Sequence, residues 1–199
     1  MLKPLYQFRT ECCENDGAWQ YALRSRAFRC QFCGAVAKFV SLPCEILPPV
    51  RDAHTPIVSG ACPVRVAFIP SDQNRGFLNF TIGDELHCGV IDTKGCVRSY
   101  FPHEGRFRSE RFKMWKQSIV CEFPEVGAID GALWDRMIEE GIQIGVESSE
   151  MDCLDYAVSI LNLAAGRKGF TRKRLSENMG RQLYHVMQFA EAQRRAMQL

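Results

Sequence analysis

The stretch that decides the fold reads Asp152-Cys153-Leu154-Asp155-Tyr156-Ala157-Val158. It predicts an apolar helix, because Asp152 can cap the first turn and Leu154, Ala157 and Val158 lie on one face. Upstream, Leu86-His87-Cys88-Gly89-Val90-Ile91 has the short apolar pattern of a strand. A thiol at a helix start and an imidazole at a strand start are the minimal groups of a cysteine nucleophile with its base. Cys153 and His87 are therefore the first candidate catalytic residues.

Further strands and helices follow from the same periodicities. Apolar runs predict strands at Val64 to Ile69, Gly76 to Ile82, Cys96 to Phe101 and Ser118 to Phe123. Asp92-Thr93-Lys94-Gly95 reads as a hairpin turn, with Gly95 supplying the positive φ.

Three helices follow the strands. Helical spacing covers Asp130 to Glu140, with Gly141 predicted as its stop. The helix that begins at Asp152 ends at Gly166, and Thr171 looks like the N-cap of a long final helix. Strands followed by helices indicate an α+β domain, with helices packed on an antiparallel sheet.

Residues 1–63 differ in character from the rest of the chain. They are rich in cysteine and aromatic residues, and five prolines make residues 43–63 an irregular connector. Trp19, Tyr21 and Leu23 alternate as a strand would. We therefore expect a small Cys-rich N-terminal module with its connector at 1–63, and the α+β domain at 64–199.

The N-terminal module contains half of a common zinc site. Cys30-x-x-Cys33-Gly34 places two thiolates on one knuckle. The remaining predicted ligands are one residue of the adjacent pair Cys12-Cys13, taken here as Cys13, and Cys62, with Cys44 and His54 in reserve. A structural zinc held by Cys13, Cys30, Cys33 and Cys62 is one interpretation, and free thiols in a small module are the other.

Bulk properties limit the class of protein. The longest apolar runs are far shorter than a membrane span, and the N-terminus has no secretory pattern. The ten cysteines are therefore expected to be mostly reduced, in an intracellular protein of the cytoplasm or nucleus.

The segment from Gly166 onward carries a net charge of +6, and the remainder −4. With a net charge of only +2, the chain is not basic enough to indicate nucleic-acid binding.

The order of the two key motifs resembles permuted papain-like folds. In the PPPDE peptidases, the lecithin:retinol acyltransferase-like proteins and permuted NlpC/P60 domains, a His opens a strand and a Cys begins a later helix. His87-Cys88-Gly89-Val90-Ile91 and Cys153-Leu154-Asp155-Tyr156-Ala157 follow this order. The resemblance implies a helix carrying the Cys, packed against a sheet carrying the His.

A second resemblance covers most of the chain. The sequence is similar to the makorin-2 opposite-strand protein family, an uncharacterised group. The shared residues are Asp84 to Val90, Gly95 to Val97, Tyr100, His103, Trp134, Cys153, Tyr156, Ala157, Asn162, Phe170, Thr171 and the N-terminal cysteines. This resemblance supports the domain organisation and implies no activity.

Two functions from different classes remain open. One is a cysteine hydrolase or acyltransferase, in which His87 deprotonates Cys153, and His103 either orients the site or lies in a solvated turn. The other is a non-catalytic interaction protein that binds a protein partner through the zinc module. In that case Cys153 is a small buried hydrophobe of a core helix.

Overall fold

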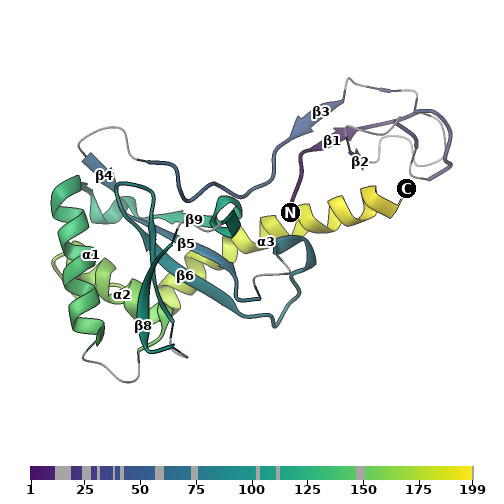
Figure 1. The fold of residues 1–199 in the computed structure, drawn as a ribbon. Coiled ribbons are helices and arrows are strands. Elements are labelled where there is room, and N and C mark those ends of the chain that lie inside the picture. Colours follow the sequence, from purple (N-terminus) through teal and green to yellow (C-terminus); the bar gives the residue numbers. More distant parts are fainter. Residues whose placement is uncertain are drawn as a thin grey trace. The chain divides into compact units, whose positions relative to one another are not determined.

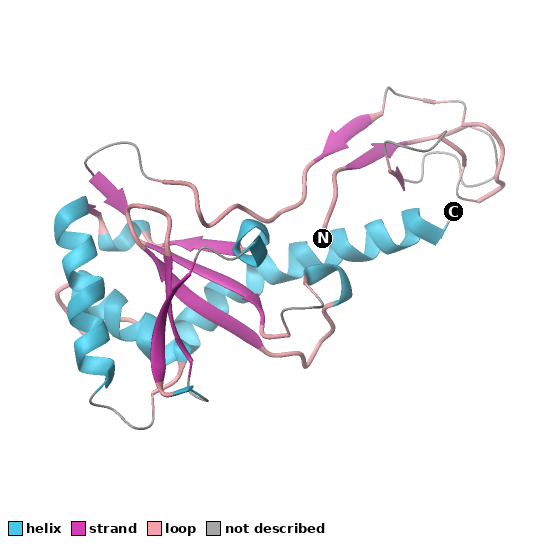
Figure 2. Cartoon of the chain, in the orientation of Figure 1, coloured by secondary structure: helices cyan, strands magenta, loops and turns pink. Residues whose placement is uncertain are grey.

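The fold combines antiparallel strands with three α-helices. The computed structural model describes residues 1–11, 19–23, 28–30, 32–37, 39–40, 43–56, 61–72, 76–101, 104–110, 113–146 and 151–198. The helices are α1 (Gly131–Val146), α2 (Cys153–Ala164) and α3 (Arg172–Gln198), shown in Figures 1 and 2. The predicted α+β class with an antiparallel sheet is confirmed.

Contacts divide the chain into two compact units. Unit 1 contains Met1–Pro49, Phe77–Thr81 and Tyr184–Leu199, and unit 2 contains Val50–Gly76 and Ile82–Leu183. The predicted domain boundary at residue 63 stays a prediction, and this division places residues 50–63 with unit 2. Both motifs of the candidate site lie in unit 2.

Unit 1 holds a small sheet and an aromatic cluster. Its strands are β1 (Leu5–Phe8), β2 (Gln20–Ala22) and β3 (Cys44–Ile46), in the antiparallel order β2-β1-β3. The rings of Phe8, Phe28 and Phe39 meet edge to face, with centroids 5.2–5.6 Å apart. Edge-to-face contact places the positive ring edge against a negative ring face, which stabilises such a small core.

Unit 2 is built on a five-stranded antiparallel sheet. The strands are β5 (Arg65–Pro70), β6 (Leu86–Ile91), β7 (Val97–Phe101), β8 (Arg106–Glu110) and β9 (Ile119–Glu122). Their spatial order is β8-β7-β6-β5-β9. A separate pair joins β4 (Ala61–Pro63) to β10 (Ala128–Asp130). The predicted strands that begin at Val64, Leu86, Cys96 and Ser118 are confirmed, with ends that shift by a residue.

The two faces of the large sheet bury different partners. One face contributes to a fully or nearly fully buried cluster with Trp115 of the 3₁₀ helix η3 (Lys113–Gln117). That cluster comprises Ala53, Ala67, Ile69, Ile91, Val97, Trp115 and Val120. The other face packs against α2, which in turn packs against α1. Because side chains alternate along a strand, neighbouring residues of β6 face different partners.

One predicted strand is wrong. Residues 76–82 contain the short 3₁₀ helix η1 (Phe77–Asn79), and the Phe80 N–H donates to the Phe77 carbonyl at 3.3 Å. Phe77 and Phe80 are both buried, with ring centroids 5.9 Å apart. Residues three apart share a side of a helical turn and oppose each other in a strand. Ile82 is 91 % exposed, so the apolar run has no second buried face.

The predicted helix stop at Gly141 is also wrong. Helix α1 continues through this residue to Val146. A Cβ on Gly141 would lie 1.9 Å from Cδ1 of Ile160, which belongs to α2. The glycine therefore permits two helices to approach closely, and it does not act as a C-cap.

The other local signals are confirmed. Gly95 has φ of 74° in the β6–β7 turn, and a Cβ there would lie 2.4 Å from the His54 carbonyl oxygen. Gly166 has φ of 62° after α2, and the Arg174 N–H donates to Oγ1 of Thr171 at the start of α3. None of the helices in the described part combines the length and apolar character that a membrane crossing requires.

Candidate active site

Cys153 is the first residue of α2, and a capping box fixes this helix end. Oδ1 of Asp152 accepts from the Leu154 N–H at 2.9 Å and from the Asp155 N–H at 2.8 Å. In return, the Asp152 N–H donates to Oδ2 of Asp155 at 3.4 Å. Two otherwise unpaired helix donors are satisfied in this way, so the backbone around the thiol is held in one conformation.

Arg172 neutralises the two carboxylates of this box. Its Nη2 lies 2.8 Å from Oδ2 of Asp152, and its Nη1 lies 2.7 Å from Oδ1 of Asp155. Burial opposes ionisation of Asp152, but hydrogen bonds from the Asp155 N–H and from Arg172 outweigh it and lower its pKa. The same two ion pairs raise the pKa of Arg172. The negative charge beside the thiol is therefore compensated by a cation from α3.

The environment favours the thiolate of Cys153. Hydrogen bonding from the Cys88 thiol is the largest influence, and together with His87 it outweighs the opposing effect of burial and lowers the pKa of Cys153 to about 5. A thiol with this pKa is mostly ionised at neutral pH, and the thiolate is the nucleophilic form. Cys153 is half-buried, so a reactant can reach it.

Cys88 is the partner of this thiolate within β6. Its side chain is 1 % exposed, and its Sγ donates a hydrogen bond to the Cys153 carbonyl oxygen at 3.2 Å. Contact with Cys153 and then burial raise the pKa of Cys88 well above the usual range. Cys88 is therefore a neutral thiol that donates to the backbone of the residue whose sulfur is ionised.

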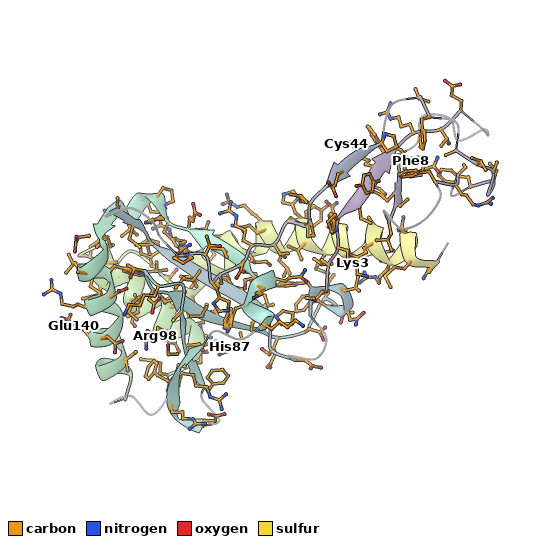
Figure 3. All side chains as sticks on the ribbon, turned by 45° about the horizontal axis from the view of Figure 1, so that its top comes forward. Lys3, Phe8, Cys44, His87, Arg98 and Glu140 are labelled. Carbon is orange, nitrogen blue, oxygen red and sulfur yellow. The ribbon has the colours of Figure 1, made fainter. Side chains whose placement is uncertain are left out.

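His87 precedes Cys88 in β6 and is held by aromatic rings. Its imidazole centroid lies 4.4 Å from the ring of Phe101 and 6.0 Å from the ring of Trp115 (Figure 3 labels His87 on the sheet). These rings flank the imidazole, which is also among the groups that act on the Cys153 thiol. The Nε2 of His87 is buried and has no hydrogen-bond partner among the described residues.

His87 is the second group that favours the thiolate of Cys153, after Cys88. The imidazole lowers the pKa of Cys153, after Cys88, through a polar contact and its charge. A buried, unpartnered ring nitrogen is costly and is typical of functional sites.

Gly89 permits β6 and β7 to approach beside the site. A Cβ at this position would lie 2.5 Å from Cγ1 of Val97 and 2.8 Å from the Arg98 carbonyl oxygen. The β6–β7 ladder pairs Val90 with Arg98 and Ile91 with Val97. The close approach at residue 89 lies two residues from His87 and brings the strand of Phe101 near the imidazole.

The helix start offers fewer oxyanion donors than its position suggests. The capping box uses the N–H groups of Leu154 and Asp155. The backbone N–H of Cys153 itself is the donor at this end that the box leaves unused. A tetrahedral oxyanion beside Cys153 would therefore find one backbone donor in α2, and others must come from elsewhere.

The other predicted site residues lie in other parts of the chain or outside the described residues. His103, Cys12 and Cys13 lie outside the described residues. Cys30 and Cys33 lie on the predicted knuckle in unit 1, where the Gly34 N–H donates to the Cys30 carbonyl at 2.9 Å. Cys62 is buried in β4 of unit 2.

No metal centre is evident in the part of the chain that the structure describes. There, no three or more His, Cys, Asp or Glu side chains are grouped so that they could hold a metal ion. Of the reserve ligands, Cys44 is exposed on β3, and Nδ1 of His54 lies 2.8 Å from the Gly95 carbonyl oxygen. Because Cys13 lies outside the described residues, the predicted zinc site stays a prediction.

Sequence reasoning missed four residues of the site. Cys88 was part of the strand motif without a role, and the aromatic rings of Phe101 and Trp115 were not associated with His87. Arg172 was counted only in the net charge of the segment from Gly166 onward. The available signal for Arg172 was the pair of carboxylates at Asp152 and Asp155, three residues apart on one helix turn, whose mutual repulsion a nearby cation relieves.

Other arginines of the tail are paired as well. Nη2 of Arg174 lies 2.9 Å from Oε1 of Glu125, and Arg194 and Arg195 each contact Glu191 at 2.8 and 2.9 Å. These pairs reduce the charge available to a polyanion.

No protein-family model, curated protein or solved structure matches the chain.

Proposed function

We propose that unit 2 is a cysteine hydrolase or acyltransferase, with Cys153 as the nucleophile and His87 as the general base and acid. The observation that carries this proposal is the environment of the Cys153 sulfur. It lies at the start of α2, with its pKa lowered to about 5 by Cys88 and His87 against the effect of burial. Structural cysteines in apolar surroundings show the opposite shift, as Cys121 does, whose pKa burial raises to about 12.

The proposed reaction follows from these groups. The Cys153 thiolate attacks the carbonyl carbon of an amide or thioester, and the carbonyl π electrons move onto oxygen. As the tetrahedral adduct collapses, the C–N or C–S bond breaks and the imidazolium of His87 protonates the leaving group. His87 then takes a proton from water, or from another acceptor nucleophile, which attacks the acyl group and releases the thiolate.

A permuted papain-like fold is part of the proposal. The order His87 strand, then Cys153 helix, and the packing of α2 on β6 agree with that arrangement. Agreement in motif order supports a reaction class and does not select a substrate. The alternative is a protein that uses the same domain for binding, with an idle thiol at residue 153.

Site-resolved alkylation tests the nucleophile. Iodoacetamide is added to the full chain at pH 6.5, and mass spectrometry follows each cysteine-containing peptide. Cys153 is expected to react at least about tenfold faster than Cys121, because a thiol of ordinary or raised pKa is almost wholly protonated at this pH. Its rate should change little between pH 6.5 and 8, whereas the rates of ordinary cysteines rise steeply.

Substitution of the base provides the second arm. His87→Ala is expected to slow the alkylation of Cys153 at pH 6.5, and His185→Ala on α3 serves as the matched control. An aryl thioester then tests turnover, with acyl-Cys153 sought by mass spectrometry. Uniformly slow labelling of all cysteines would remove the nucleophile and favour the binding protein.

A further inference from the structure

We propose that Cys153 and Cys88 form a site of reversible thiol oxidation, at which a hydroperoxide converts the two thiols into an intrachain disulfide. The proposal goes beyond acyl transfer and shares with it only the accessible thiolate of Cys153. It assigns a role to Cys88, a buried thiol that the acyl-transfer mechanism uses only as a hydrogen-bond donor.

The geometry places the Cys88 sulfur against the backbone of Cys153. Sγ of Cys88 lies 3.2 Å from the carbonyl oxygen of Cys153, so the sulfur already touches the residue to which it would bond. Disulfides need Cβ atoms within about 3.5–4.5 Å, a separation that neighbouring residues of a packed strand and helix can reach. The capping box and Arg172 fix the start of α2, and α2 packs on β6.

Exposure determines the order in which the two thiols react. Cys88 is 1 % exposed, whereas Cys153 is half-buried and accessible. A small hydroperoxide therefore meets Cys153 first, and the ionised sulfur is the form that it oxidises. Cys88 lies behind it and is positioned to act second.

The two steps balance as follows. The Cys153 thiolate attacks one peroxide oxygen, so that an S–O bond forms and the O–O bond breaks. The leaving alkoxide takes a proton from solvent and departs as an alcohol, and Cys153 becomes a sulfenic acid. Cys88 then attacks the sulfenic sulfur, the S–S bond forms, and the S–O bond breaks. Hydroxide departs with the Cys88 proton as water, and the hydroperoxide has accepted the two electrons that the thiols lost.

Coupling between the thiols favours the second step. In the reduced state, contact with Cys153 is the largest cause that raises the pKa of Cys88. A sulfenic acid at Cys153 carries no negative charge, so that cause disappears when the first step is complete. Cys88 then ionises more readily, at the stage when a nucleophile is needed. Before oxidation it remains protonated and protected.

Cys121 provides a matched control. It is also a buried thiol of the large sheet, on β9, and burial alone raises its pKa to about 12. Its described contact is with Nε2 of Gln182, 3.6 Å from its sulfur. Cys121→Ser therefore removes a buried thiol of the same sheet without removing the partner of Cys153.

The test maps disulfides in the full chain. The protein is treated with a few equivalents of hydrogen peroxide at pH 7, blocked with N-ethylmaleimide, digested and examined by mass spectrometry. The expected product is a cross-linked pair of peptides that contain Cys88 and Cys153, and dithiothreitol should restore both thiols. In Cys88→Ala, Cys153 is expected to proceed to sulfinic acid, which dithiothreitol does not reverse. Cys121→Ser should behave as the wild type.

The outcomes separate this proposal from the acyl-transfer proposal. Wild-type Cys153 that reaches sulfinic acid as fast as in Cys88→Ala, or disulfides that form only at other cysteines, would overturn it. If iodoacetamide labels Cys153 rapidly and no Cys88–Cys153 disulfide forms, only the redox site fails. If the disulfide forms and no acyl-Cys153 is ever found, the redox site stands and the hydrolase fails. Mapping of the wild type is decisive even if Cys88→Ala does not fold.

Discussion

Arg172 contacts Asp155 through Nη1 and Oδ1 at 2.7 Å, and so joins the start of α3 to the start of α2. Its second nitrogen contacts the other carboxylate of the capping box. Without this cation, two negative charges would lie beside a sulfur that is proposed to be anionic. Arg172 is therefore a positioning residue for Cys153, through the helix end that it holds.

Arg172→Ala is expected to raise the pKa of Cys153, because two uncompensated carboxylates disfavour a nearby thiolate. Alkylation of Cys153 should slow several-fold at pH 6.5 and approach the wild-type rate near pH 9.5. Arg172→Lys keeps the charge and should restore part of the rate, because a lysine cannot reproduce the fork that contacts both carboxylates. Arg174→Ala, which removes the pair with Glu125, is the control. An unchanged rate at pH 6.5 would contradict the positioning role.

The Asp152 cap is expected to contribute to global stability. Asp152→Ala should lower the free energy of unfolding by about 1 kcal/mol, because the Leu154 and Asp155 N–H groups lose their acceptor. Asp152→Asn keeps an acceptor oxygen and should cost less. Urea unfolding of the three proteins measures the difference. Equal losses in both variants would mean that charge, and not capping, is the main contribution of Asp152.

The lowered pKa of Cys153 links its ionisation to stability. The pKa falls from 9.0 to about 5 on folding, so the contribution of the thiolate is fully present above pH 9 and is lost as the pH falls toward 5. The stability difference between the wild type and Cys153→Ser should therefore grow as the pH rises from 5 to 9. Urea unfolding at several pH values measures it. A difference independent of pH would show that Cys153 is an ordinary thiol.

Gly141 and Gly180 are expected to respond to alanine in opposite ways. At Gly141 a Cβ would meet Ile160, which is fully buried, whereas at Gly180 nothing lies within 4 Å. Overpacking costs about 1–3 kcal/mol, against a helix-propensity gain of about 1 kcal/mol. Gly141→Ala should therefore be destabilised and Gly180→Ala stabilised, by thermal or urea unfolding. A gain in stability at both positions would mean that α1 and α2 separate easily.

Local signals in the sequence predicted most of unit 2. The apolar run in Leu86–Ile91, the Asp152 cap and the glycine at residue 95 each depend on a few neighbouring residues, and the structure agrees with all three. Gly141 shows where such signals fail. A glycine after a helical pattern is read as a stop, and only the packing of Ile160 from another helix explains why the helix continues.

The candidate site was also predicted only in part, because local signals identify some of its residues and distant contacts determine the others. Cys153 and His87 could be chosen because each occupies a distinctive local position. Cys88 and Arg172 could not be assigned roles, because their partners lie 65 and 17–20 residues away in the chain. The prediction of a strand at residues 76–82 was wrong because two phenylalanines in an apolar run fit a helical turn as well as a strand.

The close approach at Gly89 has a consequence for comparison with other chains. Any residue larger than glycine would force β7 away from β6 and carry the ring of Phe101 away from the imidazole. Related chains in which another residue replaces this glycine are therefore expected to have lost the contact between Phe101 and the His87 imidazole. The residue at position 89 would thus distinguish related sequences that keep the candidate site from those that keep only the fold.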